Sequence, residues 1–393
     1  MYIFASPIQY KTETGYEIID NTVVESQKDG FAFENKANDI KTYFPQTLSE
    51  PFKIEQDEES LEFSPAFDTT GFSEAKKIIF TNMYGDRISA VVYSREDMDL
   101  AFYPTKAGIK TELVLKQKPY GNVVAFNVKS TANSFENKRN GYITFMKGSE
   151  TESIIYQPLV QYENENGRQL DVTTGMEMTK EGGDYHVEIK VDENVIDHAK
   201  YPIKLDPSFE LYQDCIPDST VYSKRNVNNY LANYAVVGEH PLLGEGWHYS
   251  RLRLNWLMTL RPKDVKSAVY YTKLLCNTEN YYLRAYEPSE QWGSMGLLWR
   301  NKPEPAGQIS GNADVSNGYL GLPMDGFVRE CFGDTSWQKE SVGFVIMADG
   351  AEEADCYAVL AASDNSLYTP YIRIELKDLP RLFVPQDNIN PPT

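Results

Sequence analysis

The chain has 393 residues and a formal net charge of −19, with 41% hydrophobic and 13% aromatic residues. This length is enough for two or three domains, and the aromatic content excludes a disordered chain. The negative charge, with no basic cluster to oppose it, excludes binding to a nucleic-acid backbone. No apolar run approaches the ~18 residues that cross a bilayer, which excludes a membrane-spanning helix.

The first 206 residues predict a series of β-strands, because Tyr, Phe, Val, Ile and Thr are frequent and favour pleated surfaces. The strand-like stretches are residues 16–24, 31–33, 39–44, 78–81, 87–93, 100–103, 109–115, 123–128, 142–146, 154–162 and 185–192. The acidic stretch 55–60 (EQDEES) predicts a solvated loop, and only residues 72–77 and 193–199 are helix candidates. Because no long stretch has a helical period, an all-β fold is expected.

The second half predicts another set of strands, separated by turn signals at intervals typical of a jelly roll or β-sandwich. The strand-like stretches are residues 220–222, 235–237, 250–255, 267–275, 281–286, 341–347, 356–361 and 371–376. Pro207 cannot donate a hydrogen bond to a β-ladder, so it ends the last strand before it. We therefore expect a β-rich region at 1–206, a β-sandwich at 207–378 and an extended or disordered Pro-rich tail at 379–393.

Several short motifs of the second half follow one another in a recognisable order. They are Asp218-Ser219-Thr220-Val221-Tyr222, Ser250-Arg251-Leu252-Arg253-Leu254, Trp299-Arg300-Asn301-Lys302-Pro303, Val342-Gly343-Phe344 and Tyr368-Thr369-Pro370-Tyr371-Ile372. On these motifs the second half resembles DNRLRE-type domains, which are extracellular β-sandwich modules of bacterial and archaeal surface proteins. The sequence departs from the family pattern in its cysteines and at Cys215-Ile216-Pro217.

The first half contains three further motifs, which are Phe31-Ala32-Phe33-Glu34-Asn35-Lys36, Gly108-Ile109-Lys110-Thr111-Glu112-Leu113-Val114-Leu115 and the closing Tyr201-Pro202-Ile203-Lys204-Leu205-Asp206-Pro207. On these motifs it resembles the leader region of wall-associated, YD-repeat (Rhs-like) secreted proteins of Gram-positive bacteria. In that family the closing motif often precedes a DNRLRE-type module. The YD repeats and toxin that usually follow are missing from this sequence.

The two resemblances imply a non-enzymatic, structural or adhesive module of a bacterial cell-surface or secreted protein. They imply an extracellular or cell-surface location and a cell-envelope polysaccharide or protein as partner. One alternative is a carbohydrate-binding module, and a third is a polysaccharide-active enzyme. The start of the chain, MYIFASPIQYKTE, is not a secretory signal as written. We therefore expect that a signal was removed, that export uses another route, or that the chain is a piece of a longer protein.

The sequence offers little chemistry for catalysis or metal binding. The four histidines, His186, His198, His240 and His248, form no His-x-x-x-His motif, and no Cys-x-x-Cys or Gly-x-Ser-x-Gly motif occurs. We therefore expect no catalytic residues and no cofactor, with calcium as the one exception.

The calcium candidates are Asp349, Glu352 and Asp355, which cluster in an acidic stretch predicted to be a loop. Flexible loops with carboxylate oxygens suit calcium, but the same pattern is typical of a solvated turn.

Four aromatic residues are the candidate ligand-binding residues: Trp247, Tyr286, Trp292 and Trp299. Tyrosine and tryptophan rings can stack on sugar rings, and these four fall in or near turn-rich segments, where binding residues concentrate. The alternative is that the rings pack inside the fold. Exposed, coplanar rings beside polar groups favour sugar binding, whereas burial favours a scaffold.

The four cysteines, Cys215, Cys276, Cys331 and Cys356, all lie in the second half. An even number permits two disulfides, and the alternative is free, buried thiols that act as small hydrophobic residues.

Overall fold

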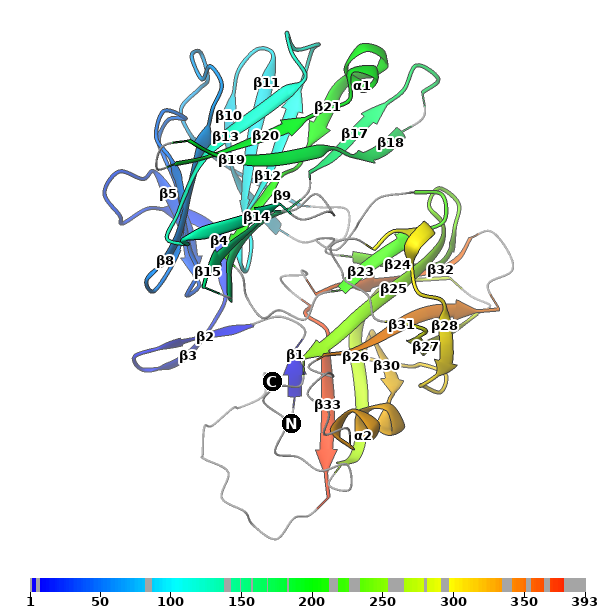
Figure 1. The fold of residues 1–393 in the computed structure, drawn as a ribbon. Coiled ribbons are helices and arrows are strands. Elements are labelled where there is room, and N and C mark those ends of the chain that lie inside the picture. Colours follow the sequence, from blue (N-terminus) through cyan, green and yellow to red (C-terminus); the bar gives the residue numbers. More distant parts are fainter. Residues whose placement is uncertain are drawn as a thin grey trace.

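The computed structural model confirms the all-β fold, with one β-rich body from each half of the sequence (Figure 1). The structure describes residues 2–4, 8–81, 87–137, 143–148, 150–156, 158–167, 169–181, 184–211, 218–225, 234–253, 265–278, 281–290, 297–333, 341–350, 355–363 and 368–377.

Within these described residues, two antiparallel sheets pack face to face in the N-terminal half. One sheet contains β4 (Asp20–Glu25), β5 (Phe33–Ala37), β6 (Lys41–Phe44), β7 (Phe52–Gln56), β8 (Glu59–Pro65), β13 (Val123–Ser130), β19 (Gly175–Glu181) and β20 (Asp184–Lys190). The other contains β9 (Lys76–Thr81), β10 (Arg87–Ser94), β11 (Met98–Pro104), β12 (Gly108–Leu115), β14 (Ser134–Asn137), β15 (Ile143–Lys147), β16 (Glu150–Tyr156), β17 (Leu159–Glu163), β18 (Gln169–Thr173), β21 (Lys200–Leu205) and β22 (Ser208–Leu211).

The core of the N-terminal half lies between these sheets and is rich in stacked phenylalanine rings. The ring centroids of Phe63 and Phe209 are 3.9 Å apart, and those of Phe52 and Phe102 are 4.0 Å apart. All four side chains are buried. Because side chains alternate along a strand, each of these strands contributes its rings from one face only.

Two local predictions for the N-terminal half are wrong. The acidic stretch 55–60 is not a loop: β7 and β8 run through it, and Gln56 pairs with Glu59 across a two-residue turn. The strands extend to the turn because every second side chain on either side of it, such as Ile54 and Leu61, is apolar and buried in the core.

The other wrong prediction is the helix at 72–77, where the chain is irregular before β9 begins at Lys76. The backbone N–H of Ser73 donates to Ser94 O, and that of Ala75 donates to Gln46 O, so neighbouring segments take the donors that a helix would use.

The helix expected at 193–199 is confirmed as α1 (Glu193–His198). The side chain of Asp192 accepts a hydrogen bond from the backbone N–H of Asn194, at 2.8 Å, and so caps its N-terminus. The helix buries Val195 and Ile196 against the sandwich.

The C-terminal half forms one extended antiparallel sheet system around its own core. Its described strands are β1 (Tyr2–Phe4), β23 (Asp218–Tyr222), β24 (Tyr234–His240), β25 (Gly244–Arg253), β26 (Val265–Asn277), β27 (Tyr282–Pro288), β28 (Pro305–Gln308), β29 (Asp314–Ser316), β30 (Tyr319–Pro323), β31 (Ser341–Asp349), β32 (Cys356–Ala361) and β33 (Tyr371–Leu376). The helix α2 (Asp325–Gly333) and the short 3-10 helix η4 (Trp299–Asn301) complete it.

Each half contributes a strand to the other, on either side of the expected boundary at 206/207. After Pro207 the chain forms β22, which pairs with β12 and β16, so residues 208–211 belong to a sheet of the N-terminal half. In the opposite direction β1 pairs with β33 in the C-terminal half, which places dark blue beside red in Figure 1. The side chain of Lys106 also reaches across, and its Nζ donates to Thr369 Oγ1 at 2.6 Å.

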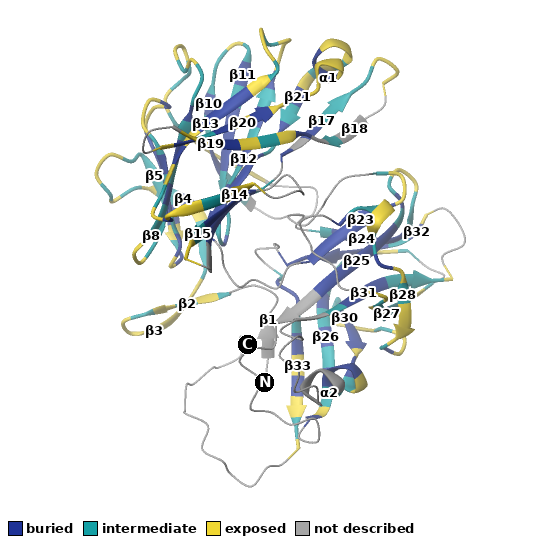
Figure 2. Ribbon diagram, viewed as in Figure 1, coloured by how far each residue is buried: buried dark blue, intermediate teal, exposed yellow. Residues whose placement is uncertain are grey.

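The hairpin of β2 (Gln9–Thr12) and β3 (Gly15–Ile18) projects away from both bodies and is largely exposed (Figure 2). Cys276 is exposed, Cys356 is buried, and both are free thiols. Cys215 and the proposed Pro-rich tail lie outside the described residues, and so does the side chain of Cys331.

Candidate functional site

The structure brings three of the four predicted aromatic residues together on the outer face of the C-terminal sheet. Trp247 on β25, Tyr286 on β27 and Trp299 in η4 contact one small apolar cluster that includes Tyr249 and Val345. Trp292 lies outside the described residues. We call the outer side of β25, β31 and β27, with the segment 297–304 that covers part of it, the aromatic face.

Strand register explains why these side chains meet. Val345 on β31 is the pairing partner of Tyr249 on one side and of Tyr286 on the other, so the three side chains share a face. Trp247 is two residues before Tyr249 and therefore points the same way. Next to it, Gly246 is required, because a Cβ there would lie 2.2 Å from Val236 O on β24.

A lysine fills the space between the two tryptophans. The Lys302 Nζ lies 3.8 Å from the ring centroid of Trp247 and 4.5 Å from that of Trp299. The lysine side chain is only 6% exposed, and its Nζ lies 2.6 Å from Glu304 Oε1. The cation therefore makes two cation–π contacts, and its charge is balanced at the rim by a carboxylate.

The tryptophans themselves are held as packing residues. Trp247 is 7% exposed, and its indole N–H donates to Glu245 Oε1 at 2.8 Å. The rings of Trp247 and Trp299 are 5.2 Å apart and inclined by 59°, so they are not coplanar. Below them the hydroxyl of Tyr249 donates to Pro303 O at 2.5 Å, which fixes the covering segment to the sheet.

The other end of the aromatic face is polar and more open. Asp349 accepts hydrogen bonds from Arg284 Nη1, at 2.8 Å, and from the hydroxyl of Tyr286. Arg284 Nε also donates to Asn312 Oδ1 at 2.7 Å. Burial, together with the bond to Asp349, raises the pKa of the Tyr286 hydroxyl. The ring of Tyr282, 58% exposed, lies beside the guanidinium of Arg284, 5.6 Å from centroid to Cζ.

The sequence predicted Tyr286 and Asp349 as site residues, whereas Tyr282, Arg284 and Asn312 were not predicted. The alternation in Tyr282-Leu283-Arg284-Ala285-Tyr286 was the available signal, since it places the two tyrosines and the arginine on one face. Asn312 enters from a distant loop, and only the fold shows its place.

Two of the three predicted calcium ligands, Asp349 and Asp355, lie within the described residues. Asp349 Oδ2 forms an ion pair with Arg284 Nη1 at 2.8 Å. The backbone N–H of Asp355 donates to Glu239 O, and Glu352 lies outside the described residues. The described part of the chain contains no group of three or more His, Cys, Asp or Glu side chains that could hold a metal ion.

The inner face of the same sheet holds a buried polar cluster that sequence analysis did not find. His248 alternates with Trp247 and so points into the core, where its Nδ1 lies 3.1 Å from Thr220 Oγ1. Its Nε2 lies 3.5 Å from Asp218 Oδ2, which also accepts from the backbone N–H of Ser363 at 2.6 Å. Burial lowers the pKa of His248 to about 3, so the imidazole is neutral.

The hydroxyl, imidazole and carboxylate follow one another in the order found in a catalytic triad, but their burial differs from that of an active site. Asp218, Thr220 and His248 are all buried, so the hydroxyl of Thr220 faces the protein interior. Burial, followed by the charge of Asp218, also raises the pKa of the neighbouring Tyr270. The cluster therefore acts as an internal polar contact between β23, β25 and β26.

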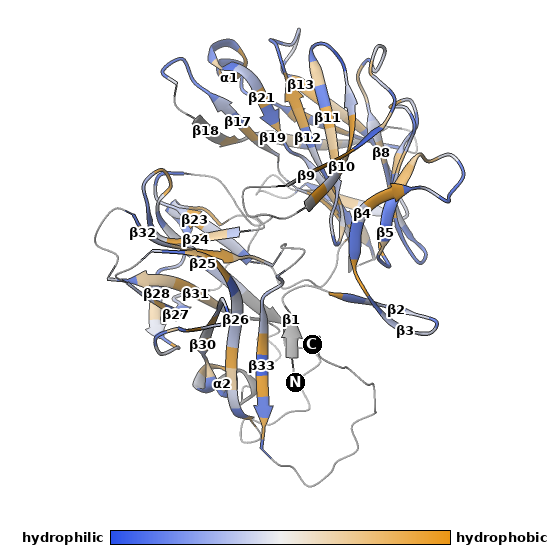
Figure 3. Ribbon diagram, turned by 180° about the vertical axis from the view of Figure 1, so that it is seen from behind, coloured by the Kyte–Doolittle hydropathy of each residue, from blue (hydrophilic) through white to orange (hydrophobic). Residues whose placement is uncertain are grey.

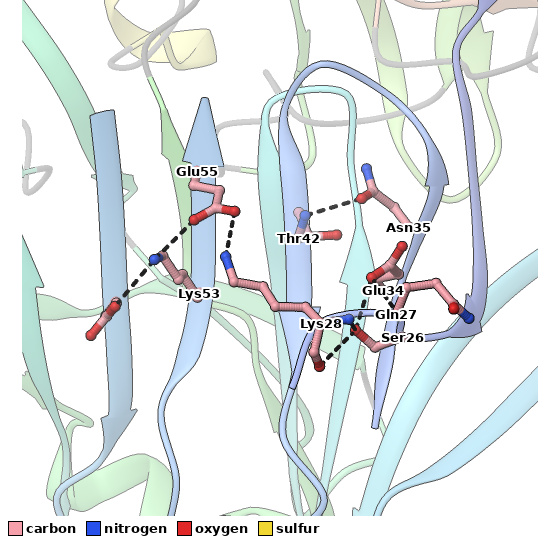
Figure 4. A network of polar contacts seen from close by, with 9 residues as sticks. Ser26, Gln27, Lys28, Glu34, Asn35, Thr42, Lys53 and Glu55 are labelled. Carbon is pink, nitrogen blue, oxygen red and sulfur yellow. Dashed lines mark hydrogen bonds and ion pairs between the residues drawn. The ribbon is translucent and has the colours of Figure 1, made fainter. Parts of the chain in front are cut away.

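The N-terminal half carries a surface network of charges around Glu55 (Figure 4). Lys28 Nζ lies 2.5 Å from Glu55 Oε1 and Lys53 Nζ lies 2.9 Å from Glu55 Oε2. Partial burial alone raises the pKa of Glu55, but the hydrogen bonds from Lys28, Lys53 and Tyr43 outweigh it and lower the pKa to about 2. These charges satisfy one another between β7 and the turn that joins β4 to β5.

No helix among the described residues has the length and apolar character that crossing a bilayer requires. No protein-family model matches this chain. No curated protein matches it either. The two resemblances therefore remain predictions that depend on the motifs themselves.

Among solved structures, the chain aligns with the crystal structure of the N-terminal domain of the Streptococcus gordonii adhesin Sgo0707, with 8% identity, over 93% of this chain and 95% of that chain. The TM-score is 0.18, which is too low to show a common fold.

Proposed function

We propose that this chain is a non-enzymatic structural or adhesive module of a bacterial cell-surface or secreted protein. The observation that carries the proposal is Lys302 between Trp247 and Trp299. Because the cation occupies the ring faces, the largest aromatic side chains of this sheet stabilise the fold and leave no open stacking platform there. The acidic surface and the motifs shared with extracellular modules support the same role.

Carbohydrate binding is the second candidate, and one observation favours it. The exposed ring of Tyr282 lies beside Arg284, Asp349 and Asn312, which already hold one another in fixed positions. An aromatic ring with ordered polar neighbours suits a sugar, whose apolar ring face stacks while its hydroxyls bond to the rim. Since the charge of Arg284 is balanced by Asp349, a neutral sugar is the better match.

The test is co-sedimentation of the full chain with isolated cell walls and insoluble polysaccharides, with and without calcium. The variants are Tyr282→Ala, Trp247→Ala, Trp292→Ala and Trp299→Ala, each checked for folding. The control is Leu242→Ala, which removes an exposed side chain in the turn between β24 and β25. Saturable binding that only Tyr282→Ala abolishes supports the second candidate. Absence of binding to every glycan supports a structural role, and soluble sugar released during incubation would overturn both.

A further inference from the structure

The strand β9 is an exposed edge with an apolar sequence. It ends its sheet and, within the described residues, pairs only with β10 (Figure 3). Every residue from Lys76 to Phe80 is exposed, including Ile78 at 40%, Ile79 at 47% and Phe80 at 40%. An edge strand presents unpaired backbone N–H and C=O groups, so a long apolar edge invites pairing with another chain.

The exposure on both faces follows from how the two sheets overlap. On the opposite sheet β4 is the outermost strand, and its Val23 N–H donates to Ser89 Oγ on β10, at 2.9 Å. The sheet of β4 therefore covers β10, where Val91 is fully buried, but leaves the next strand uncovered. Ile79 points to the same side as Ser89, its pairing partner, and yet remains exposed.

The usual protections of an edge are weak here. The six pairs between β9 and β10 run in continuous register with no bulge, and β9 contains no proline. Lys76 and Lys77 are its only charges, and both lie at one end. A lysine pair at one end blocks parallel self-pairing, which places like charges side by side, but it does not block antiparallel pairing.

We propose that β9 is the interaction surface for a second copy of this chain, joined edge to edge and antiparallel about a two-fold axis centred on Ile78. In this register Ile78 of one copy faces Ile78 of the other. Lys77 faces Ile79, and Lys76 faces Phe80. Each lysine then meets an apolar side chain instead of a lysine, so the strand is complementary to itself in charge as well as in hydrogen bonding. The assembly stops at a dimer, because the contact uses the same edge strand of both copies and leaves neither β9 edge for a third copy.

The test is sedimentation equilibrium of the full chain over a wide concentration range, for the native sequence and for Ile79→Lys. Ile79 is about half exposed, so the substitution should leave each copy folded, while the new charge opposes pairing. We expect a concentration-dependent dimer whose dissociation constant rises at least ~10-fold in Ile79→Lys. The matched control is Ile18→Lys, an equally apolar exposed position on the β2–β3 hairpin, which should dimerise normally.

Hydrogen exchange locates the contact. The amides of residues 76–80 should exchange more slowly as the concentration of the native chain rises, and this protection should be absent in Ile79→Lys. A chain that stays monomeric at every concentration would overturn the proposal. A dimer that Ile79→Lys leaves intact would also overturn it. Exchange in β9 that does not depend on the chain's concentration would do the same, even if β9 captures unrelated extended peptides.

Discussion

Both halves of this protein are built from antiparallel β-strands, but they differ in what fills their cores. The N-terminal core contains stacked rings, among them Phe52, Phe63, Phe102 and Phe209. The C-terminal core consists mostly of smaller apolar residues and encloses the polar cluster around His248. Ring stacking does not depend on protonation, whereas a buried imidazole must stay neutral. We therefore expect the two β-rich halves of one chain to respond differently to acid.

The largest effect is expected when the ring stack is broken. Phe63→Ala removes a ring that lies against both Phe52 and Phe209, and the closely packed neighbours cannot fill the space. We expect a loss of about 3–5 kcal/mol in the free energy of unfolding of the N-terminal half. Urea unfolding followed by circular dichroism measures it, and a loss below ~1 kcal/mol would contradict the packing described.

Acid should destabilise the C-terminal half first. The pKa of His248 is lowered from 6.5 to about 3 by burial, so its stability contribution is complete above pH 6.5 and is lost as the pH falls toward 3. Between pH 7 and pH 4.5 we expect a loss of about 3 kcal/mol, measured by thermal unfolding at several pH values. His248→Gln should flatten this profile. His186→Gln, on the N-terminal half, should leave it unchanged, and identical profiles for both variants would contradict the prediction.

Removal of the cation from the aromatic face should have a moderate effect. Lys302→Met keeps the aliphatic stem but loses both cation–π contacts, and we expect a cost of about 1–2 kcal/mol. Lys180→Met is the matched control, since the exposed Lys180 makes one cation–π contact among the described residues, 5.1 Å from the ring centroid of Tyr185, and its loss should cost about 0.5 kcal/mol. Chemical unfolding of both variants tests the difference, and equal losses would show that the double contact has no special role.

Below pH 4.5 the N-terminal half should begin to lose stability as well. The pKa of Glu55 is about 2 in the folded chain against 4.5 ordinarily, so its contribution is present above pH 4.5 and is lost as the pH falls toward 2. Solvent screening limits the loss to about 1 kcal/mol. Glu55→Gln should remove this pH dependence in acid unfolding curves, and an unchanged curve would show that the network is not linked to folding.

The smallest effect is expected on the β2–β3 hairpin. Ile18 is 69% exposed, so Ile18→Ser should change the stability of either half by no more than about 0.5 kcal/mol. A larger loss in thermal unfolding would mean that the hairpin contacts one of the bodies in solution.

Much of the fold was predictable from local pattern. The strands at 78–81 and 87–93 and the helix near 193–199 were predicted from the sequence, and the structure confirms them. The hairpin at 55–60 was missed because acidic residues at a tight turn are typical of a loop, and only the buried residues on either side reveal the strands. Local patterns also gave no sign that β22 returns to the sheet of β12.

The candidate site was predictable in composition but not in arrangement. Residue type alone pointed to Trp247, Tyr286 and Trp299, and the fold brings them together. Lys302 lies between the two tryptophan rings and makes them packing residues, and a search for aromatic residues does not identify this lysine. The role of His248 was missed for a similar reason, because its partners Asp218 and Thr220 on β23 are distant in sequence and meet it only through strand register.

The pairing of β1 with β33 has a mechanical consequence. Tyr2 lies opposite Arg373, while Phe4 lies opposite Tyr371, so β1 begins beside the end at which β33 leaves the sheet. A stretching force applied through Tyr2 and Leu376 therefore pulls the two strands apart from that end, and their hydrogen bonds break one after another. Until they separate, the load bypasses the N-terminal half, which lies within the loop that this strand pair closes. The short first strand is thus a release point, and the larger body comes under tension only after it opens.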